Sequence, residues 1–257
     1  MTEYVRIEHN GEAVYAILDN ERCRLLDRAP WLGAQPTGRE VDVRSVRLLA
    51  PVAPSKIIGV GRNYAAHARE LDQEIPKEPL WFLKAPSSLL DPGGVVVLPF
   101  ESQRVDHEAE LGVVIGRRGR RVPKERALEH VFGYTIVCDV TARDLQRRDG
   151  QWTRAKSFDT FCPVGPGIVT DIDAAALGVR LHVGAELRQS GNTRSVLFDV
   201  STIVAHVSAA MTLEPGDLIS TGTPEGVGPL ADGDDVTVDI DRVGQLSFRV
   251  VREDGPR

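Results

Sequence analysis

Residues 104–116, RVDHEAELGVVIG, alternate between apolar and polar positions in a way that is typical of a β-strand. The odd positions are mostly apolar, and the even positions begin with Asp106, Glu108 and Glu110. Because successive strand side chains point to opposite faces, this strand would bury one face and present three carboxylates on the other. Carboxylates on one face repel each other, and a hard divalent cation would offset that repulsion. A solvated acidic face is the alternative, and the stretch alone favours neither.

Short apolar runs dominate the rest of the chain. The first two, at 4–7 and 13–18, are joined through Asn10-Gly11, a dipeptide typical of a tight hairpin turn. A strand is expected to begin at Lys56 and enter a glycine turn, and residues 80–84 are an apolar run that ends in a lysine. Further strands are expected at 95–98, 132–139, 167–169, 179–183, 235–240 and 246–251. Helical patterns cover 65–74, 122–130 and 199–210, and a helix or helical turn is expected after Asp139. Many short strands with few helices predict a β-rich mixed α/β fold rather than alternating βαβ units.

Paired prolines at positions 51 and 54 interrupt helix and strand alike, so we place a domain boundary there. The chain is expected to divide into a small N-terminal β region, residues 1–50, and a larger domain, residues 51–257.

Composition narrows the class of protein. The net charge of −6 and the pI near 5.6 argue against nucleic acid and anionic membranes as partners. No stretch predicts a signal peptide or a membrane span. Three widely spaced cysteines, Cys23, Cys138 and Cys162, indicate a reducing compartment rather than a disulfide framework. We therefore expect a cytoplasmic protein without a nucleic-acid or membrane partner.

A glycine turn and a helical pattern follow the proposed boundary. Gly59-Val60-Gly61 is reminiscent of a dinucleotide-binding loop, but Tyr64 stands where that fingerprint needs a small residue, so a nucleotide fold is rejected. His67 and Glu70 are spaced to share a helix face, where a carboxylate can orient an imidazole as a base. An exposed surface pair is the alternative. A proline-bounded loop follows, so this helix could lie on a mobile segment.

Three further features have both a chemical and a structural interpretation. Asp139 ends a predicted strand and is either a binding residue or a helix cap. Lys156, near two phenylalanines, either extends its amine to solvent or is buried and reactive. The glycine-rich loop 220–228 either wraps an anion with backbone N–H groups or is a plain turn.

Taken together, these features resemble the fumarylacetoacetate hydrolase family in its small bacterial form, over residues 55–251. The matching segments are NYAAH at 63–67, FLK at 82–84, HEAEL at 107–111, DVTARDLQ at 139–146, KSFD at 156–159 with Pro163, and TGTP at 221–224 with GVG at 226–228. The resemblance implies a mixed β-sandwich roll with a small N-terminal β region, and usually a homodimer. It makes residues 51–257 the catalytic domain.

The resemblance also implies the roles of particular residues. Mg²⁺ or Mn²⁺ would be held by Glu108, Glu110 and Asp139. The catalytic residues would be His67 and Glu70, on a lid over the substrate, and Lys156. The substrate-contacting residues would be Arg143, Gln146 and Thr223. Cys138 departs from the family, which often has asparagine before the aspartate. Whether Arg62, Lys84 or Asp106 joins the site is left open.

The leading hypothesis is a divalent-metal-dependent hydrolase that cleaves a C–C bond in acylpyruvate-type 2,4-dioxo acids through a metal-stabilised pyruvate enolate. In it, His67 with Glu70 activates water. Two alternatives need a related enolate: decarboxylation of an oxaloacetate-like acid, and isomerisation of a 2-hydroxyhepta-2,4-diene-1,7-dioate-type acid, as in aromatic-acid catabolism. In each case the partner is a small 2-oxo acid. A non-catalytic β-rich protein with structural Ca²⁺ is the alternative from another class, but it has no use for His67, Glu70 and Lys156.

Overall fold

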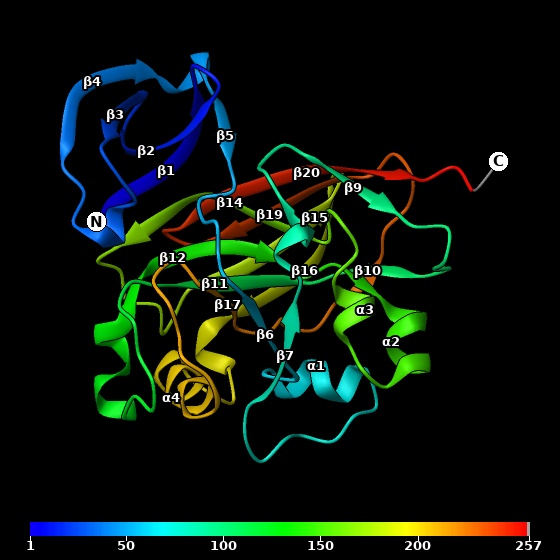
Figure 1. The fold of residues 1–257 in the computed structure, drawn as a ribbon. Helices are drawn as coiled ribbons and strands as arrows, with labels where there is room; N and C mark the ends of the chain where they lie inside the picture. Colours follow the sequence, from blue (N-terminus) through cyan, green and yellow to red (C-terminus); the bar gives the residue numbers. More distant parts are fainter. Residues whose placement is uncertain (256–257) are drawn as a thin grey trace.

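In a computed structural model, which describes residues 1–255, the short apolar runs of the chain form strands (Figure 1). These strands are arranged in three sheets. The largest sheet has twelve strands, and its main path runs β4-β3-β2-β1-β14-β12-β11-β17-β6-β7. These strands, with β5 paired to β1 and β8 paired to β14, are β1 (Thr2–His9), β2 (Glu12–Asp19), β3 (Arg22–Leu26), β4 (Pro36–Asp42), β5 (Arg47–Leu49), β6 (Ile57–Gly61), β7 (Leu80–Lys84), β8 (Leu89–Leu90), β11 (Ala109–Ile115), β12 (Val131–Cys138), β14 (Cys162–Thr170) and β17 (Leu218–Ser220).

Two smaller sheets complete the strand arrangement. The three-stranded sheet has the order β13-β10-β18, with β10 (Val105–His107), β13 (Thr141–Ala142) and β18 (Gly228–Pro229). The five-stranded sheet has the order β16-β15-β19-β20-β9, with β9 (Val95–Leu98), β15 (Gly178–Val183), β16 (Glu186–Asn192), β19 (Asp235–Ile240) and β20 (Gly244–Arg252). Most pairs are antiparallel, but β17–β6, β20–β9 and β14–β8 are parallel. The predicted β-rich, mixed fold is confirmed.

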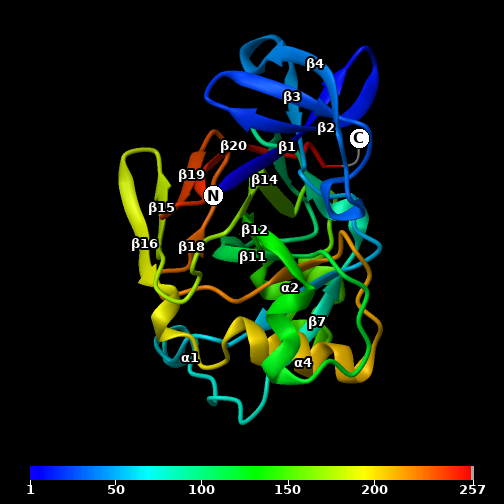
Figure 2. The ribbon, with the colours of Figure 1, turned by 90° about the vertical axis from the view of Figure 1, so that its left-hand side faces the viewer.

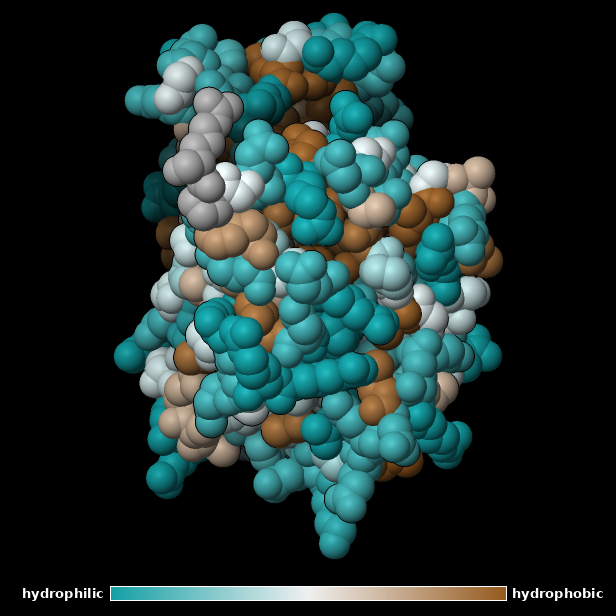
Figure 3. Space-filling view, turned by 90° about the vertical axis from the view of Figure 1, so that its right-hand side faces the viewer, coloured by the Kyte–Doolittle hydropathy of each residue, from teal (hydrophilic) through white to brown (hydrophobic). Residues whose placement is uncertain are grey.

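Helices are few and short. They are α1 (Ala65–Glu70), α2 (Arg143–Asp149), α3 (Thr153–Lys156) and α4 (Val200–Ala210), with 3-10 turns at Pro30–Leu32, Val43–Ser45, Pro86–Ser88, Lys124–His130 and Thr193–Ser195. Figures 1 and 2 place the N-terminal strands β1–β4 at one end of the molecule and α1 and α4 at the other. Hydrophilic side chains cover most of the side that carries α2 and α3 (Figure 3). Within residues 1–255, no helix is long and apolar enough to cross a membrane.

The N-terminal strands have their own apolar cluster, which includes Val5, Ile7 and Ala16. The predicted hairpin is present, because Asn10 and Gly11 adopt φ angles of 54° and 79°, the left-handed pair that a tight two-residue turn requires. The first residues of β1 also pair with β14, so the N-terminal region extends the large sheet.

The predicted acidic strand is two strands rather than one. β10 belongs to the three-stranded sheet, β11 lies between β12 and β17 in the large sheet, and Glu108 lies at the change from one sheet to the other. Both faces of β11 are buried: Leu111 and Val113 pack in the main apolar core, whereas Val114 packs in a second core on the opposite face. The solvated acidic face is therefore wrong, because this strand lies between two apolar layers.

Two helical predictions are corrected. The helix expected over 65–74 ends at Glu70, because Asp72 takes a left-handed φ of 52° and the amides of Asp72 and Gln73 bond back to the carbonyls of Arg69 and Ala68. This pattern is a Schellman motif, which terminates a helix. The helical pattern at 122–130 is a 3-10 segment, Lys124–His130, that packs against α4. The predicted helix at 199–210 is present, with the Asp199 side chain capping its first turn.

Candidate active site

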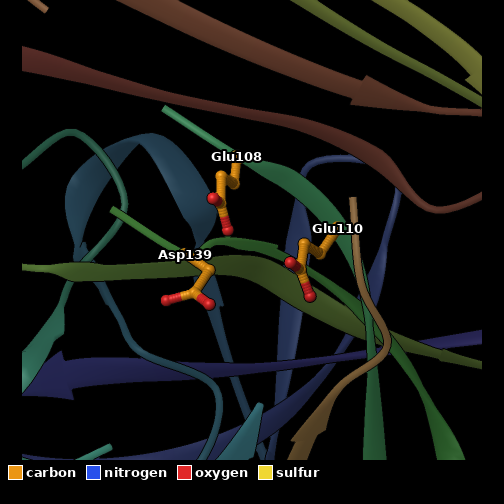
Figure 4. A group of neighbouring side chains, drawn as sticks. All are labelled: Glu108, Glu110 and Asp139. Carbon is orange, nitrogen blue, oxygen red and sulfur yellow. The ribbon is translucent and has the colours of Figure 1, made fainter. Parts of the chain in front are cut away.

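Three carboxylates meet where the small and large sheets join (Figure 4). Glu108 precedes β11, Glu110 lies on it, and Asp139 follows the neighbouring strand β12. Ala109 of β11 pairs with Cys138 of β12, and the Asp139 amide donates to the Glu108 carbonyl at 2.8 Å. This register places Asp139 beside Glu108. One oxygen of each carboxylate lies within 4.8 Å of the others, and all three residues are buried.

Two buried lysines neutralise part of this charge. Lys156, on α3, places its Nζ 2.7 Å from both Glu108 Oε2 and Asp139 Oδ2. Lys84, at the end of β7, places its Nζ 2.7 Å from Asp139 Oδ1 and also donates to the backbone carbonyls of Lys156 and Phe161. Lys156 is therefore a desolvated lysine, and the interpretation that its amine extends to solvent is wrong.

Arg143 is the third buried cation of the site. Its Nε donates to Asp106 Oδ2 at 2.9 Å, and its Nη2 donates to Glu108 Oε1 at 2.5 Å. Its Nη1 donates to Gln146 Oε1 at 2.7 Å, which fixes Gln146 one helical turn further along α2. Asp106 is completely buried, and it accepts from the same guanidinium as Glu108, so it orients Arg143.

Glycine-rich loop 220–228 wraps carboxylates of the protein itself. Glu110 Oε2 accepts hydrogen bonds from Ser220 Oγ and from the Gly222 amide, both at 2.6 Å. The Gly226 amide donates to Glu70 Oε1 at 3.0 Å. The loop therefore holds Glu110 from one side and the end of α1 from the other.

Thr223 lines the pocket, but its hydroxyl is already engaged. Its Oγ1 donates to the Ala109 carbonyl at 2.9 Å and accepts from Gln189 Nε2 at 2.8 Å. Gln189 is fully buried on β16, and its Oε1 accepts from the Ala109 amide. These bonds fix the loop against β11 and place the Thr223 side chain at the pocket wall.

The charges shift the carboxylate pKa values in opposite directions. Burial, helped by the charges of Asp139 and Glu108, raises the pKa of Glu110 to about 8. Burial alone would also raise the pKa of Glu108, but Lys156 and Arg143 outweigh it and hold that pKa below its usual range. Burial disfavours the charged form of Lys156, but the charges of Asp139 and Glu108 outweigh burial and raise the Lys156 pKa. A bound dication would oppose the shift at Glu110 by favouring its ionised form.

The predicted dyad faces this cluster from α1. His67 is buried, and its Nδ1 lies 3.3 Å from Glu70 Oε2, whereas Glu70 is partly exposed behind it. Because Nδ1 is engaged, Nε2 is the nitrogen left for chemistry in the pocket. The surface-pair interpretation is wrong for His67.

One pocket unites these groups. It is lined by eight of the nine predicted site residues, His67, Glu108, Glu110, Asp139, Arg143, Gln146, Lys156 and Thr223, together with Val60, Gly61, Arg62, Leu71, Gln73, Phe82 and Trp152. The ninth, Glu70, supports His67 from outside. The cavity volume is about 20 Å³, which is close to the space of a single water molecule. A larger ligand can enter only when a wall moves, and α1 carries part of that wall through His67. Glu70 of this helix bonds the Gly226 amide, as described above.

The donor set fits a divalent cation. Three convergent carboxylate oxygens suit hard ions such as Mg²⁺ or Mn²⁺, which leave other coordination positions to water or substrate. The raised Glu110 pKa reflects the same charge density that a dication would relieve. The cluster can therefore bind a divalent metal.

Sequence reasoning left Lys84 and Asp106 unassigned, and the structure places both beside the carboxylates. Lys84 ends an apolar run, but nothing in that run indicates that its amine reaches Asp139. Cys138 packs in the main apolar core, where burial raises the pKa of its thiol. The departure from the family at Cys138 therefore places an apolar group behind the site.

Comparison with known proteins gives consistent results. Residues 56–251 match the fumarylacetoacetate (FAA) hydrolase C-terminal family, and residues 3–51 match the Rv2993c-like N-terminal family. Human oxaloacetate tautomerase FAHD2B, a mitochondrial protein, is 40% identical over an alignment of 264 positions that covers 98% of this chain and 79% of that protein.

Two solved structures extend the comparison. The crystal structure of 2-hydroxyhepta-2,4-diene-1,7-dioate isomerase from Mycobacterium marinum is 41% identical, with a TM-score of 0.92 over 100% of both chains. Maleylpyruvate hydrolase from Sphingobium sp. SYK-6, in complex with manganese(II) and pyruvate, is 33% identical, with a TM-score of 0.82 over 98% of this chain and 100% of that one. These likenesses confirm the expected fold. The chain belongs to the fumarylacetoacetate hydrolase family.

Proposed function

We propose that the protein is a divalent-metal-dependent enzyme that enolises a small 2-oxo acid, and that keto–enol tautomerisation is the activity its site supports best. The observation that carries this proposal is His67, which lines one narrow pocket together with the three carboxylates and is paired with Glu70 behind it. Tautomerisation needs only one base that moves a proton between two atoms of a bound substrate.

Each protein group has a defined task in this reaction. A cation held by Glu108, Glu110 and Asp139 would supply Lewis acidity to the 2-oxo acid end of the substrate. His67 Nε2 removes a proton from C3, the C–H electron pair forms the C2–C3 double bond, and the carbonyl oxygen at C2 accepts a proton. Glu70 stabilises the imidazolium that forms in between. Lys156 adds positive potential beside the developing negative charge on that oxygen.

The similar proteins include both isomerising and hydrolytic enzymes. A human oxaloacetate tautomerase and a mycobacterial isomerase are 40% and 41% identical, and two hydrolases of the family are 38% and 33% identical. Hydrolysis of an acylpyruvate is the second candidate, because the same dyad can activate a water molecule once the pocket opens. We also propose a homodimer, which sedimentation would show as twice the 28.1 kDa chain mass.

The test is a panel of oxaloacetate and acetylpyruvate, assayed with Mg²⁺, Mn²⁺ or EDTA for enol–keto conversion and for C–C cleavage. His67→Ala should lower tautomerisation by about 10²- to 10⁴-fold, the usual contribution of a general base. His182→Ala, on β15 away from the pocket, is the matched control and should keep wild-type activity. Metal-dependent turnover that survives His67→Ala would contradict the proposal, as would a wild-type protein inactive on both substrates.

A further inference from the structure

Arg62 stands apart from the other cations of the pocket. It occupies the turn between β6 and α1, and it lines the same pocket as His67 and the three carboxylates. Its backbone takes a left-handed φ of 57°, a conformation that arginine rarely adopts. The fold thus holds Arg62 at the pocket wall at a conformational cost.

The guanidinium is placed by an aromatic ring rather than by an anion. Its central carbon lies 5.7 Å from the centre of the Trp152 ring, a cation–π arrangement. A Cβ on Gly61 would lie 2.5 Å from that ring, so the glycine before Arg62 is what admits Trp152. The stacking on this ring orients the guanidinium.

Within residues 1–255, Arg62 forms no ion pair, and its buried Nε has no hydrogen-bond partner. Buried polar groups nearly always have a partner, so this donor is an exception that calls for one. Lys84, Arg143 and Lys156, in contrast, are each bonded to carboxylates of the protein. Arg62 is therefore the pocket cation that the described chain does not neutralise.

The charge balance shows what could neutralise it. The buried charged groups around the pocket are the carboxylates Asp106, Glu108, Glu110 and Asp139 and the cations Lys84, Arg143 and Lys156. When all are ionised they leave one negative charge, and a bound dication changes this to one positive charge. A single substrate carboxylate would balance that charge, so Arg62 provides for a second anionic group.

We propose that Arg62 binds the distal carboxylate of the substrate, and that the enzyme therefore selects 2-oxo dicarboxylic acids over 2-oxo acids with an uncharged distal group. This inference rests on the proposed function, in which the 2-oxo acid end lies at the carboxylate cluster. A planar guanidinium held by Trp152 can grip a carboxylate through two parallel N–H bonds.

The experiment compares oxaloacetate with acetylpyruvate, which has an uncharged acetyl group in place of the distal carboxylate. Arg62→Met should raise the KM for oxaloacetate about 10- to 100-fold, the range for a charge-assisted hydrogen-bonded pair. For acetylpyruvate, both kcat and KM should stay within threefold of wild type. Arg62→Lys should recover part of the loss because it restores the charge. Arg69→Met, an exposed arginine of α1 outside the pocket, should leave both substrates unchanged. Equal changes for the two substrates, or none for oxaloacetate, would overturn the inference.

A binding measurement separates this inference from the proposed function. Malate and lactate differ by the same distal carboxylate, and calorimetry on the Mn²⁺-loaded protein reads their affinities without turnover. Wild type should bind malate at least tenfold more tightly than lactate, and Arg62→Met should abolish the difference. A wild-type protein that does not discriminate between them overturns the role of Arg62, whatever its activity. Discrimination without any turnover would overturn the proposed function alone.

Discussion

At the scale of single residues, Lys156 shows how finely the pocket balances charge. Its amine lies 2.7 Å from two carboxylates, and all three groups are almost completely buried. Buried ions depend on their partners, because removal of one leaves the other without compensation in a medium of low dielectric. A dication in the same cluster would supply the missing positive charge.

Lys156→Met should therefore destabilise the metal-free protein by about 3–5 kcal/mol, as expected when a buried ion pair loses one partner. Mn²⁺ should restore a large part of that stability but not the activity, because the amine beside the reacting oxygen is gone. Urea unfolding in EDTA and in Mn²⁺ measures the stability, and the oxaloacetate assay measures the activity.

The matched control is Arg154→Met, on the same short helix as Lys156, which removes the ion pair between the exposed Arg154 and Asp149 of α2. It should change stability by less than about 1 kcal/mol in either condition. Loss of stability in Lys156→Met that Mn²⁺ does not reduce would show that the metal does not bind at these carboxylates.

At the scale of elements, α1 depends on loop 220–228 for its position. Glu70 accepts from the Gly226 amide, and Gly226 has a φ of 92° at a position where an added Cβ would lie 2.2 Å from the Arg188 carbonyl oxygen. A methyl group at Gly226 would overlap that carbonyl, so the loop would have to move and its bond to Glu70 would be lost.

Gly226→Ala should therefore release α1. Hydrogen exchange at the α1 amides should become about tenfold faster or more, because exchange protection reports the free energy of local opening. Gly233→Ala is the matched control: its φ is 87°, but no atom lies within 4 Å of the added Cβ. Equal exchange in α1 for both variants would show that the Glu70–Gly226 contact does not hold this helix.

The same scale shows which elements the sequence could predict. The hairpin at Asn10-Gly11 and the Asp199-capped helix depend on local turn and capping chemistry, which a sequence displays directly. The break at Glu108 depends on two different sheets that pair with β10 and β11, and no local pattern encodes that choice. The early end of α1 similarly depends on the left-handed Asp72, where asparagine or glycine would have been a stronger signal.

At the scale of the whole molecule, the site depends on contacts between distant segments. The family resemblance identified Glu108, Glu110 and Asp139 as a group, and the structure shows their oxygens within 4.8 Å. Lys84 lies 55 positions from Asp139 and Asp106 lies 37 positions from Arg143, and no spacing rule connects such pairs. The role of Arg62 could not be predicted from the sequence either, because the missing partner of its Nε is a property of the folded pocket.

Metal removal tests how the site relates to the fold as a whole. Three extensive apolar clusters hold the sheets together, and the carboxylates lie at a junction between sheets rather than within those clusters. EDTA should therefore abolish metal-dependent turnover, by about 100-fold or more if the cation supplies several kcal/mol of transition-state stabilisation. The far-UV circular dichroism spectrum should be retained. Mn²⁺ should raise the melting temperature as its concentration increases above its Kd, because it binds only the folded protein. A structural Ca²⁺ site makes the opposite prediction, in which EDTA unfolds the protein and Ca²⁺ alone restores it.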